Sequence, residues 1–147
     1  MLLAACGGED QEPLSKAEYE REALALAEGK GSEAAGLFFE IVTGLIPPDE
    51  CKVKATRFHE TLEEIVAEIE RLRPPQEVAD LQRDFLVTAR ESVADVGRAV
   101  EDVQEGDLSC GFDLNKRIYG LPSTDRAEAI VSEYHELGYL HFFLYGE

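Results

Sequence analysis

Two long amphipathic stretches on either side of a double proline constrain the fold of this chain most strongly. Between residues 49 and 72, apolar side chains recur at spacings of four and three, as on one face of a long helix. They are Phe58, Leu62, Ile65, Ile69 and Leu72. A second stripe runs to about Glu105 through Val78, Leu81, Phe85, Ala89, Val93, Val96, Val100 and Val103. A short turn at Pro74 and Pro75 joins the two helices, so they are predicted to pack antiparallel.

A shorter helix is predicted ahead of this pair. Ser15 and Glu18 have the spacing of a capping box, and Leu14 with Tyr19 fits the hydrophobic staple that accompanies it. The helix is expected to reach about Glu28 and to be stopped by the glycines of residues 29–31.

Another helix is predicted over residues 32–44, ended by the prolines at 47 and 48. Its apolar side chains are Leu37, Phe38, Phe39, Ile41 and Val42, followed by Leu45 and Ile46. Because they surround the helix nearly completely, this helix is expected to be the most buried element.

The C-terminal part has a less regular pattern. Residues 112–119 fit either a short helix or an alternating strand, and residues 120–122 break it. The next helix has three possible caps, Ser123, Thr124 and Asp125, and Gly138 suits the position after its end. Four of the twelve aromatic residues follow in a tail over residues 139–145, which is expected to be extended and to pack back on the helices.

These patterns predict one mainly α domain over residues 14–147, an antiparallel bundle of four to five helices with a short irregular or extended aromatic tail. The 147 residues of the whole chain suit a single domain, and 44% hydrophobic residues are enough for a core.

The start of the chain resembles the lipobox of bacterial lipoproteins. Leu3-Ala4-Ala5-Cys6 has an apolar residue, two small residues and a cysteine, and the polar residues up to Pro13 look like the tether that follows such a cysteine. Only five residues, none of them Lys or Arg, precede Cys6, whereas a signal peptide has roughly 15–30 residues and a basic start. Residues 1–5 are therefore interpreted as the remnant of a longer signal peptide and residues 6–13 as lipidated cysteine and tether. The alternative is a cytosolic protein in which this motif arose by chance.

The wider pattern is similar to small bacterial lipoproteins: a lipobox, an acidic tether and a helical domain that opens at residues 14–19 and turns at residues 72–78. This resemblance implies that Cys6 accepts the diacylglyceryl group. It implies attachment to the outer face of the bacterial cytoplasmic membrane or elsewhere in the cell envelope, and it implies no catalytic residue and no cofactor.

Assigning Cys6 to the lipid leaves Cys51 and Cys110, and an even remainder in an exported domain favours a disulfide. Both cysteines are expected at the open end of the predicted hairpin, which supports the pairing. A metal site is less favoured, because neither a CxxC motif nor a nearby histidine is present. No sequence feature marks either cysteine as a reactive thiol.

The net charge of −17 disfavours nucleic acid and anionic headgroups as partners. Such a surface would attract cations and basic peptides, or serve solubility alone. His59 and Glu63, four residues apart, and His135 with His141 around Gly138 are weak candidates for metal ligands.

No nucleophile elbow, phosphate-binding loop or dinucleotide fingerprint occurs, so an enzyme is not favoured. The expected function is that of an anchored binding or interaction module for an envelope protein or a small ligand. The alternatives are a cation- or metal-binding bundle and a hydrolase without a recognisable motif. The sequence leaves the oligomeric state open.

Overall fold

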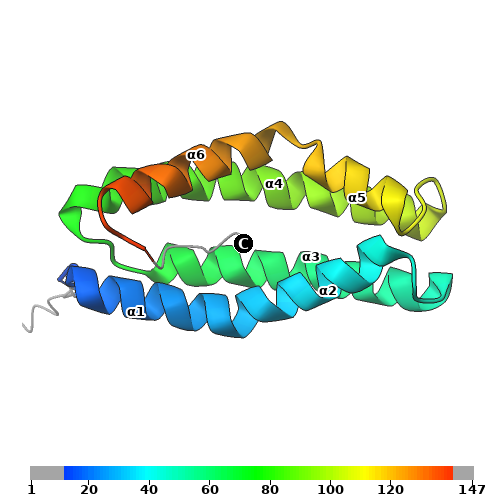
Figure 1. The fold of residues 1–147 in the computed structure, drawn as a ribbon, viewed down its shortest axis with the longest axis horizontal. Helices are drawn as coiled ribbons and strands as arrows, with labels where there is room; N and C mark the ends of the chain where they lie inside the picture. Colours follow the sequence, from blue (N-terminus) through cyan, green and yellow to red (C-terminus); the bar gives the residue numbers. More distant parts are fainter. Residues whose placement is uncertain (1–11, 141–147) are drawn as a thin grey trace, which may run out of the picture.

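The computed structural model describes residues 12–140, and in this part of the chain all regular structure is helical (Figure 1). The α-helices are α1 (Lys16–Leu26), α2 (Ser32–Thr43), α3 (Pro48–Arg71), α4 (Ala79–Glu105), α5 (Phe112–Tyr119) and α6 (Pro122–Glu136). A π-helical turn, η1 (Ala27–Gly31), joins α1 to α2, and a 3-10 turn, η2 (Gln76–Val78), leads into α4. The prediction of a mainly α bundle is confirmed.

The helices form four antiparallel rods (Figure 1). The first rod is α1, η1 and α2 in succession, the second is α3, the third is α4, and the fourth is α5 followed by α6. Of the two alternatives for residues 112–119, the helix is the one observed.

The central pair of rods, α3 and α4, matches the predicted hairpin within one residue at the start and end of α3 and at the end of α4. Their stripes supply much of the core, including Phe58, Ile65 and Ile69 from α3 and Phe85, Val96 and Val100 from α4. The other two rods add Tyr19, Ile41, Leu114, Val131 and Tyr134, so a single core runs the length of the bundle.

Local sequence signals fix several helix ends as predicted. The Ser15 hydroxyl accepts a hydrogen bond from the Glu18 N–H, and the Glu18 carboxylate accepts one from the Ser15 N–H, which completes the capping box. Such a cap contributes about 1 kcal/mol to stability. After α6, Gly138 has a φ of 80°, and the Tyr139 N–H donates to the Tyr134 carbonyl, as in a glycine-ended helix.

The prediction that residues 29–31 stop the first helix is wrong, because the chain continues through η1 into α2. The inward positions from Tyr19 to Ile41 follow spacings of 4-3-4-4-3-4, through Ala23, Leu26, Lys30, Ala34 and Leu37. A helix packed on the regular heptads of α3 would need 4-3-4-3, so this rod has one extra residue. The wide turn of a π-helix absorbs that residue and keeps both halves facing α3.

Two other expectations are wrong. α2 buries Ala34 and Ile41, whereas α4 buries eight residues, because part of the apolar circumference of α2, including Phe39, faces solvent. At α6 the helix begins at Pro122 with Leu121 as its N-cap, and no side chain caps it. Proline suits the first turn of a helix, so α6 starts before the three candidate caps.

Deleting Gly29 should convert η1 into an ordinary α-helical turn. The inward-facing residues of α1 and of α2 should still face α3. We expect the variant to keep its helical content and to melt within a few degrees of the wild type. Deleting Ala67 instead should destabilise the fold severely, because α3 has no wide turn and half of its stripe would rotate by about 100°. Circular dichroism with thermal melting measures both, and equal losses in the two variants would contradict the role of η1.

Candidate functional site

A disulfide between Cys51 and Cys110 closes the end of the bundle at which α3 begins and α4 ends. Cys51 lies in the first turn of α3 and is fully buried, and Cys110 lies in the loop between α4 and α5. Their Cα atoms are 6.6 Å apart. The predicted pairing is confirmed, and it fastens the loop that carries α5 to the start of α3.

Two glycines bring the α4–α5 loop against the turn after α2. Gly44 and Gly111 both have positive φ values, 68° and 93°. A Cβ atom on Gly111 would lie only 3.4 Å from the Cα of Gly44, and the Gly111 N–H donates a 2.8 Å hydrogen bond to the Ile41 carbonyl. The disulfide and this backbone contact therefore hold the two turns together as one rigid surface.

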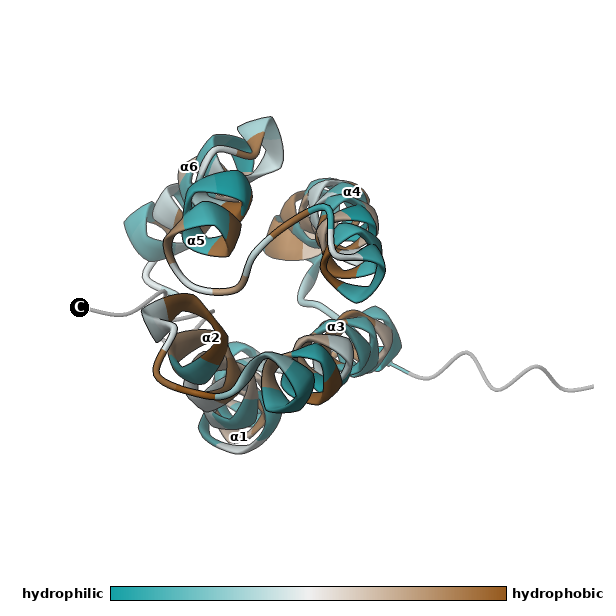
Figure 2. Ribbon diagram, turned by 90° about the vertical axis from the view of Figure 1, so that its right-hand side faces the viewer, coloured by the Kyte–Doolittle hydropathy of each residue, from teal (hydrophilic) through white to brown (hydrophobic). Residues whose placement is uncertain are grey.

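Large apolar side chains are exposed on the elements that meet at this surface. Their exposed fractions are 64% for Phe39, 82% for Leu45, 76% for Phe112 and 66% for Tyr119. We call these four residues the apolar end patch. Leu45 and Phe112 follow the two touching glycines, and the Tyr119 ring packs 5.7 Å from the ring of Phe38, the neighbour of Phe39. Figure 2 looks onto this end, where the ribbon of α2 is mostly brown.

Acidic side chains without ion-pair partners lie on the helix ends and the loop at the same end of the bundle as the apolar end patch. Asp49, Glu105, Asp107 and Asp113 form no ion pair within 4 Å in the described part of the chain. The bases of this region include Lys54, which is paired with Glu40 and Glu50, and Arg117, which is paired with Asp102. Lys52 and Lys116 are the bases there without an ion pair, so the unpaired charge is mainly negative.

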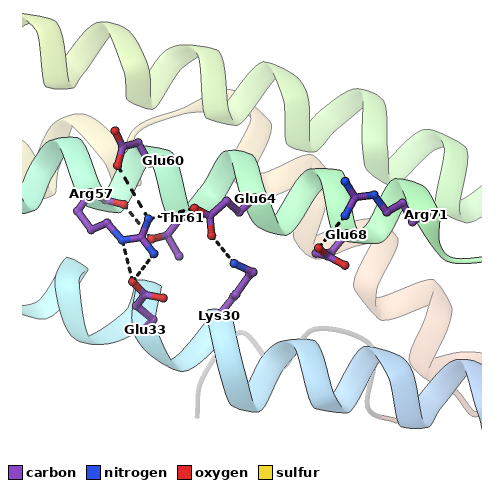
Figure 3. A network of polar contacts seen from close by, with 8 residues as sticks. All are labelled: Lys30, Glu33, Arg57, Glu60, Thr61, Glu64, Glu68 and Arg71. Carbon is purple, nitrogen blue, oxygen red and sulfur yellow. Dashed lines mark hydrogen bonds and ion pairs between the residues drawn. The ribbon is translucent and has the colours of Figure 1, made fainter.

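A second group of charges joins the first two rods near η1 (Figure 3). Arg57 on α3 lies 2.7 Å from the Glu33 carboxylate and 3.0 Å from that of Glu64, and Lys30 also pairs with Glu64. The hydrogen bond from Lys30, then that from Arg57, lowers the pKa of Glu64. Because these groups satisfy one another, we interpret the cluster as a fastening between rods.

The candidate pair His59 and Glu63 lies at an open groove of about 510 Å³ between α3 and α4. The His59 Nε2 is 3.9 Å from the Glu63 carboxylate, too far for a hydrogen bond. The imidazole packs over Gly97, where a Cβ atom would come within 2.8 Å of Nε2. Two ligands on one helix are too few for a structural metal site.

The other histidine candidates do not join His59. His135 is exposed in the last turn of α6, at the opposite end of the bundle from the disulfide, and His141 lies outside the described residues. Within residues 12–140, no group of three or more His, Cys, Asp or Glu side chains could hold a metal ion. The same stretch contains no helix long and apolar enough to cross a membrane.

A buried polar cluster closes the other end of the bundle. The Tyr19 hydroxyl donates to the Gln82 carbonyl oxygen at 2.8 Å and lies 3.2 Å from the Tyr134 hydroxyl. The Gln82 amide in turn donates to the carbonyls of Ile69 and Leu72, where α3 ends. Burial raises the pKa of Tyr19 and of Tyr134, because the phenolate would be poorly solvated.

The tail prediction is tested only at its start. Tyr139 is fully buried, its ring stands edge-on to both Tyr19 and Tyr134, and its hydroxyl donates to Glu77. Residues 141–147 lie outside the described part, as do Cys6 and most of the predicted tether.

Sequence reasoning found the disulfide but missed the apolar end patch. The sequence places Phe39 on a helix expected to be buried, and it indicates no functional role for residues 112–119. The apolar run through Leu45 and Ile46 into a double proline was the available signal, because a turn normally carries polar residues.

The chain matches no protein-family model, no curated protein and no solved structure.

Replacing both Cys51 and Cys110 by serine should lower the free energy of unfolding by about 4 kcal/mol, because the bridge closes a loop between residues 59 apart in sequence. Chemical denaturation of the variant and the oxidised wild type measures the difference. An unchanged midpoint would show that the bridge contributes no stability.

Alkaline pH should destabilise the protein through its buried tyrosines. Below pH 10 the tyrosines are protonated in both the folded and the unfolded state. Above pH 10 they ionise in the unfolded state but stay protonated where they are buried in the folded state. The free energy of unfolding should then fall by about 1.4 kcal/mol per pH unit for each of Tyr19, Tyr134 and Tyr139, because burial also raises the pKa of Tyr139. Denaturation curves from pH 9 to 12 measure the slope. Tyr134→Phe should reduce this slope by the contribution of one tyrosine, about 1.4 kcal/mol per pH unit. An identical slope in the variant would show that Tyr134 does not contribute to the loss of stability.

Proposed function

We propose that the protein is a lipid-anchored interaction module on the outer face of the bacterial cytoplasmic membrane or in the cell envelope, which docks an envelope partner on its apolar end patch. Cys6 carries the lipid, and residues 6–13 are the tether. The observation that carries the proposal is the gathering of four large apolar side chains, each more than 60% exposed, at the end of the bundle that the disulfide closes.

The pairing of the cysteines supports the role of Cys6. The sequence has three cysteines, and Cys51 and Cys110 are bonded to each other. Cys6 is therefore the one cysteine not engaged in this bridge, and it stands directly after the lipobox-like Leu3-Ala4-Ala5. A disulfide of this kind is also typical of proteins outside the reducing cytosol.

The contacts of the chain near residue 12 indicate that the tether and the apolar end patch lie at opposite ends of the bundle. The Leu14 N–H donates to the Arg73 carbonyl, and the Arg73 guanidinium donates to the Glu12 carbonyl. These bonds hold the start of the described chain at the turn between α3 and α4 (Figure 1). The apolar end patch lies at the opposite end, roughly 36 Å away, the length of the 24-residue α3.

A tether attached at one end therefore directs the patch away from the lipid surface. Soluble proteins seldom leave several large apolar side chains together in water, and such surfaces mark sites of association. The geometry suits a protein that stands on a membrane and offers its far end to another envelope component.

Two measurements in the native host test this proposal. The intact mass of protein extracted from membranes should fit a chain that begins at diacylated Cys6, and Cys6→Ser should release the protein from the membrane fraction. A mass that fits Met1 onward with an unmodified Cys6 would overturn the anchor.

Docking is tested by a photo-reactive amino acid placed at single positions. Placed at Leu45 or Phe112, it should give a discrete cross-linked product in intact cells. Val87 is the matched control, because it is an exposed valine on α4 near the opposite end of the bundle. Equal cross-linking from all three positions, or none from Leu45 and Phe112, would contradict docking at this end.

A further inference from the structure

We propose that the occupant of the apolar end patch is a protein segment in which apolar side chains are flanked by Lys or Arg. This inference rests on the proposed function and adds the chemical class of the partner. It excludes two other occupants of an exposed apolar surface, a second copy of the chain and an anionic lipid surface.

The shape of the site favours a protein segment. The contact between Gly44 and Gly111 leaves no side chain between the two turns, so Leu45 and Phe112 flank a point where backbone meets backbone. The exposed Tyr119 and the half-buried Phe38 extend the apolar surface along α2 and α5. A few apolar anchors of a partner would fit such a surface, as in the centre of an ordinary protein interface.

The surface is also pre-organised. The disulfide holds the α4–α5 loop at the start of α3, and the Gly111 N–H holds the same loop to the Ile41 carbonyl. Phe38 packs between Phe58 of the core and Tyr119 of α5, which fixes the two helices that carry the patch. A partner would therefore bind without first ordering the site, which reduces the entropy lost on association.

The charges around the patch identify the partner as basic. Asp113 directly follows Phe112, Asp107 lies in the loop before Cys110, and Asp49 lies in the first turn of α3. Within residues 12–140 none of these carboxylates forms an ion pair, and with Glu105 they outnumber the unpaired bases of this end, Lys52 and Lys116. Positive side chains beside the apolar anchors of a partner would complement these charges and accelerate encounter.

The same charges argue against the other occupants. A second copy would bring its own unpaired carboxylates to the contact, and each chain has a net charge of −17. An anionic lipid surface would meet the same repulsion at Asp107 and Asp113. The partner that covers the exposed Phe39 and Leu45 therefore carries positive charge, opposite to the charge of this chain.

A synthetic peptide with leucine and phenylalanine flanked by lysines is the first probe, used with the full chain. It should bind wild-type protein and bind more weakly as salt rises, because salt screens exposed charges. A peptide of the same pattern with glutamate in place of lysine should not bind. Neither should a lysine peptide with serine in place of its apolar residues.

Matched variants separate the apolar and charged parts of the site. The double variant Leu45→Ser with Phe112→Ser should weaken binding of the lysine–leucine–phenylalanine peptide at least tenfold. The double variant Asp107→Asn with Asp113→Asn should weaken it severalfold and flatten its salt dependence. Val87→Ser should bind like the wild type, and a thermal melt of each variant checks that it is folded.

The inference is overturned if the folded patch variants bind like the wild type, or if the glutamate peptide binds as well as the lysine peptide. Sedimentation showing a dimer that the Leu45 and Phe112 substitutions abolish would identify a second copy as occupant. Binding to vesicles of anionic phospholipid that depends on those two residues would identify lipid. If cross-linking at Leu45 and Phe112 finds a partner but these peptide results fail, the interaction module stands and only the basic partner class is wrong.

Discussion

The antiparallel pairing of α3 and α4 is the interaction on which the rest of the structure depends. Their stripes meet along the middle of the bundle, and the outer two rods complete the core on them. Both ends of the pair are fixed by specific bonds. Gln82 on α4 donates to the Ile69 and Leu72 carbonyls where α3 ends, and the disulfide joins the start of α3 to the loop after α4. The bonds at both ends fix the register of α3 against α4. The other two rods therefore pack on a pair of helices that cannot slide past each other.

The two ends of this frame have opposite chemistry. At one end the rods converge on the hydroxyls of Tyr19 and Tyr134, and Tyr139 covers them, so aromatic side chains are buried with hydrogen-bond partners. At the other end a covalent bond and a contact between two glycines hold the turns together. Because these fastenings need no large side chains, Leu45 and Phe112 remain in solvent. Among the described residues, four large apolar side chains are exposed at the disulfide end, whereas Leu137 and Leu140 are the exposed ones near the tyrosine end.

The long helices, the capping box and the disulfide could be predicted because each depends on residues whose partners are set by local spacing or by the pairing of neighbouring helices. The wide turn at η1 could not be predicted from its glycines. Isolated from tertiary contacts, Gly29-Lys30-Gly31 would end a helix. In the folded chain the stripes on both sides pack on α3, and Lys30 pairs with Glu64, so continuing the rod is more favourable than breaking it. The sequence predicts too much burial for α2, because apolar residues all round a helix do not determine how many other helices pack against it.

The sequence by itself determined the number and amphipathic faces of the long helices, the cap at Ser15, the acidic surface and the pairing of Cys51 with Cys110. Each of these follows from side-chain chemistry at fixed spacing along the chain. The tertiary structure alone decided that α1 and α2 form one rod and that Phe39, Leu45, Phe112 and Tyr119 gather at one end. It also decided that His59 and His135 stay apart. These outcomes depend on which rods are neighbours and on the close approach of Gly44 and Gly111, and both are set by packing between segments distant in sequence.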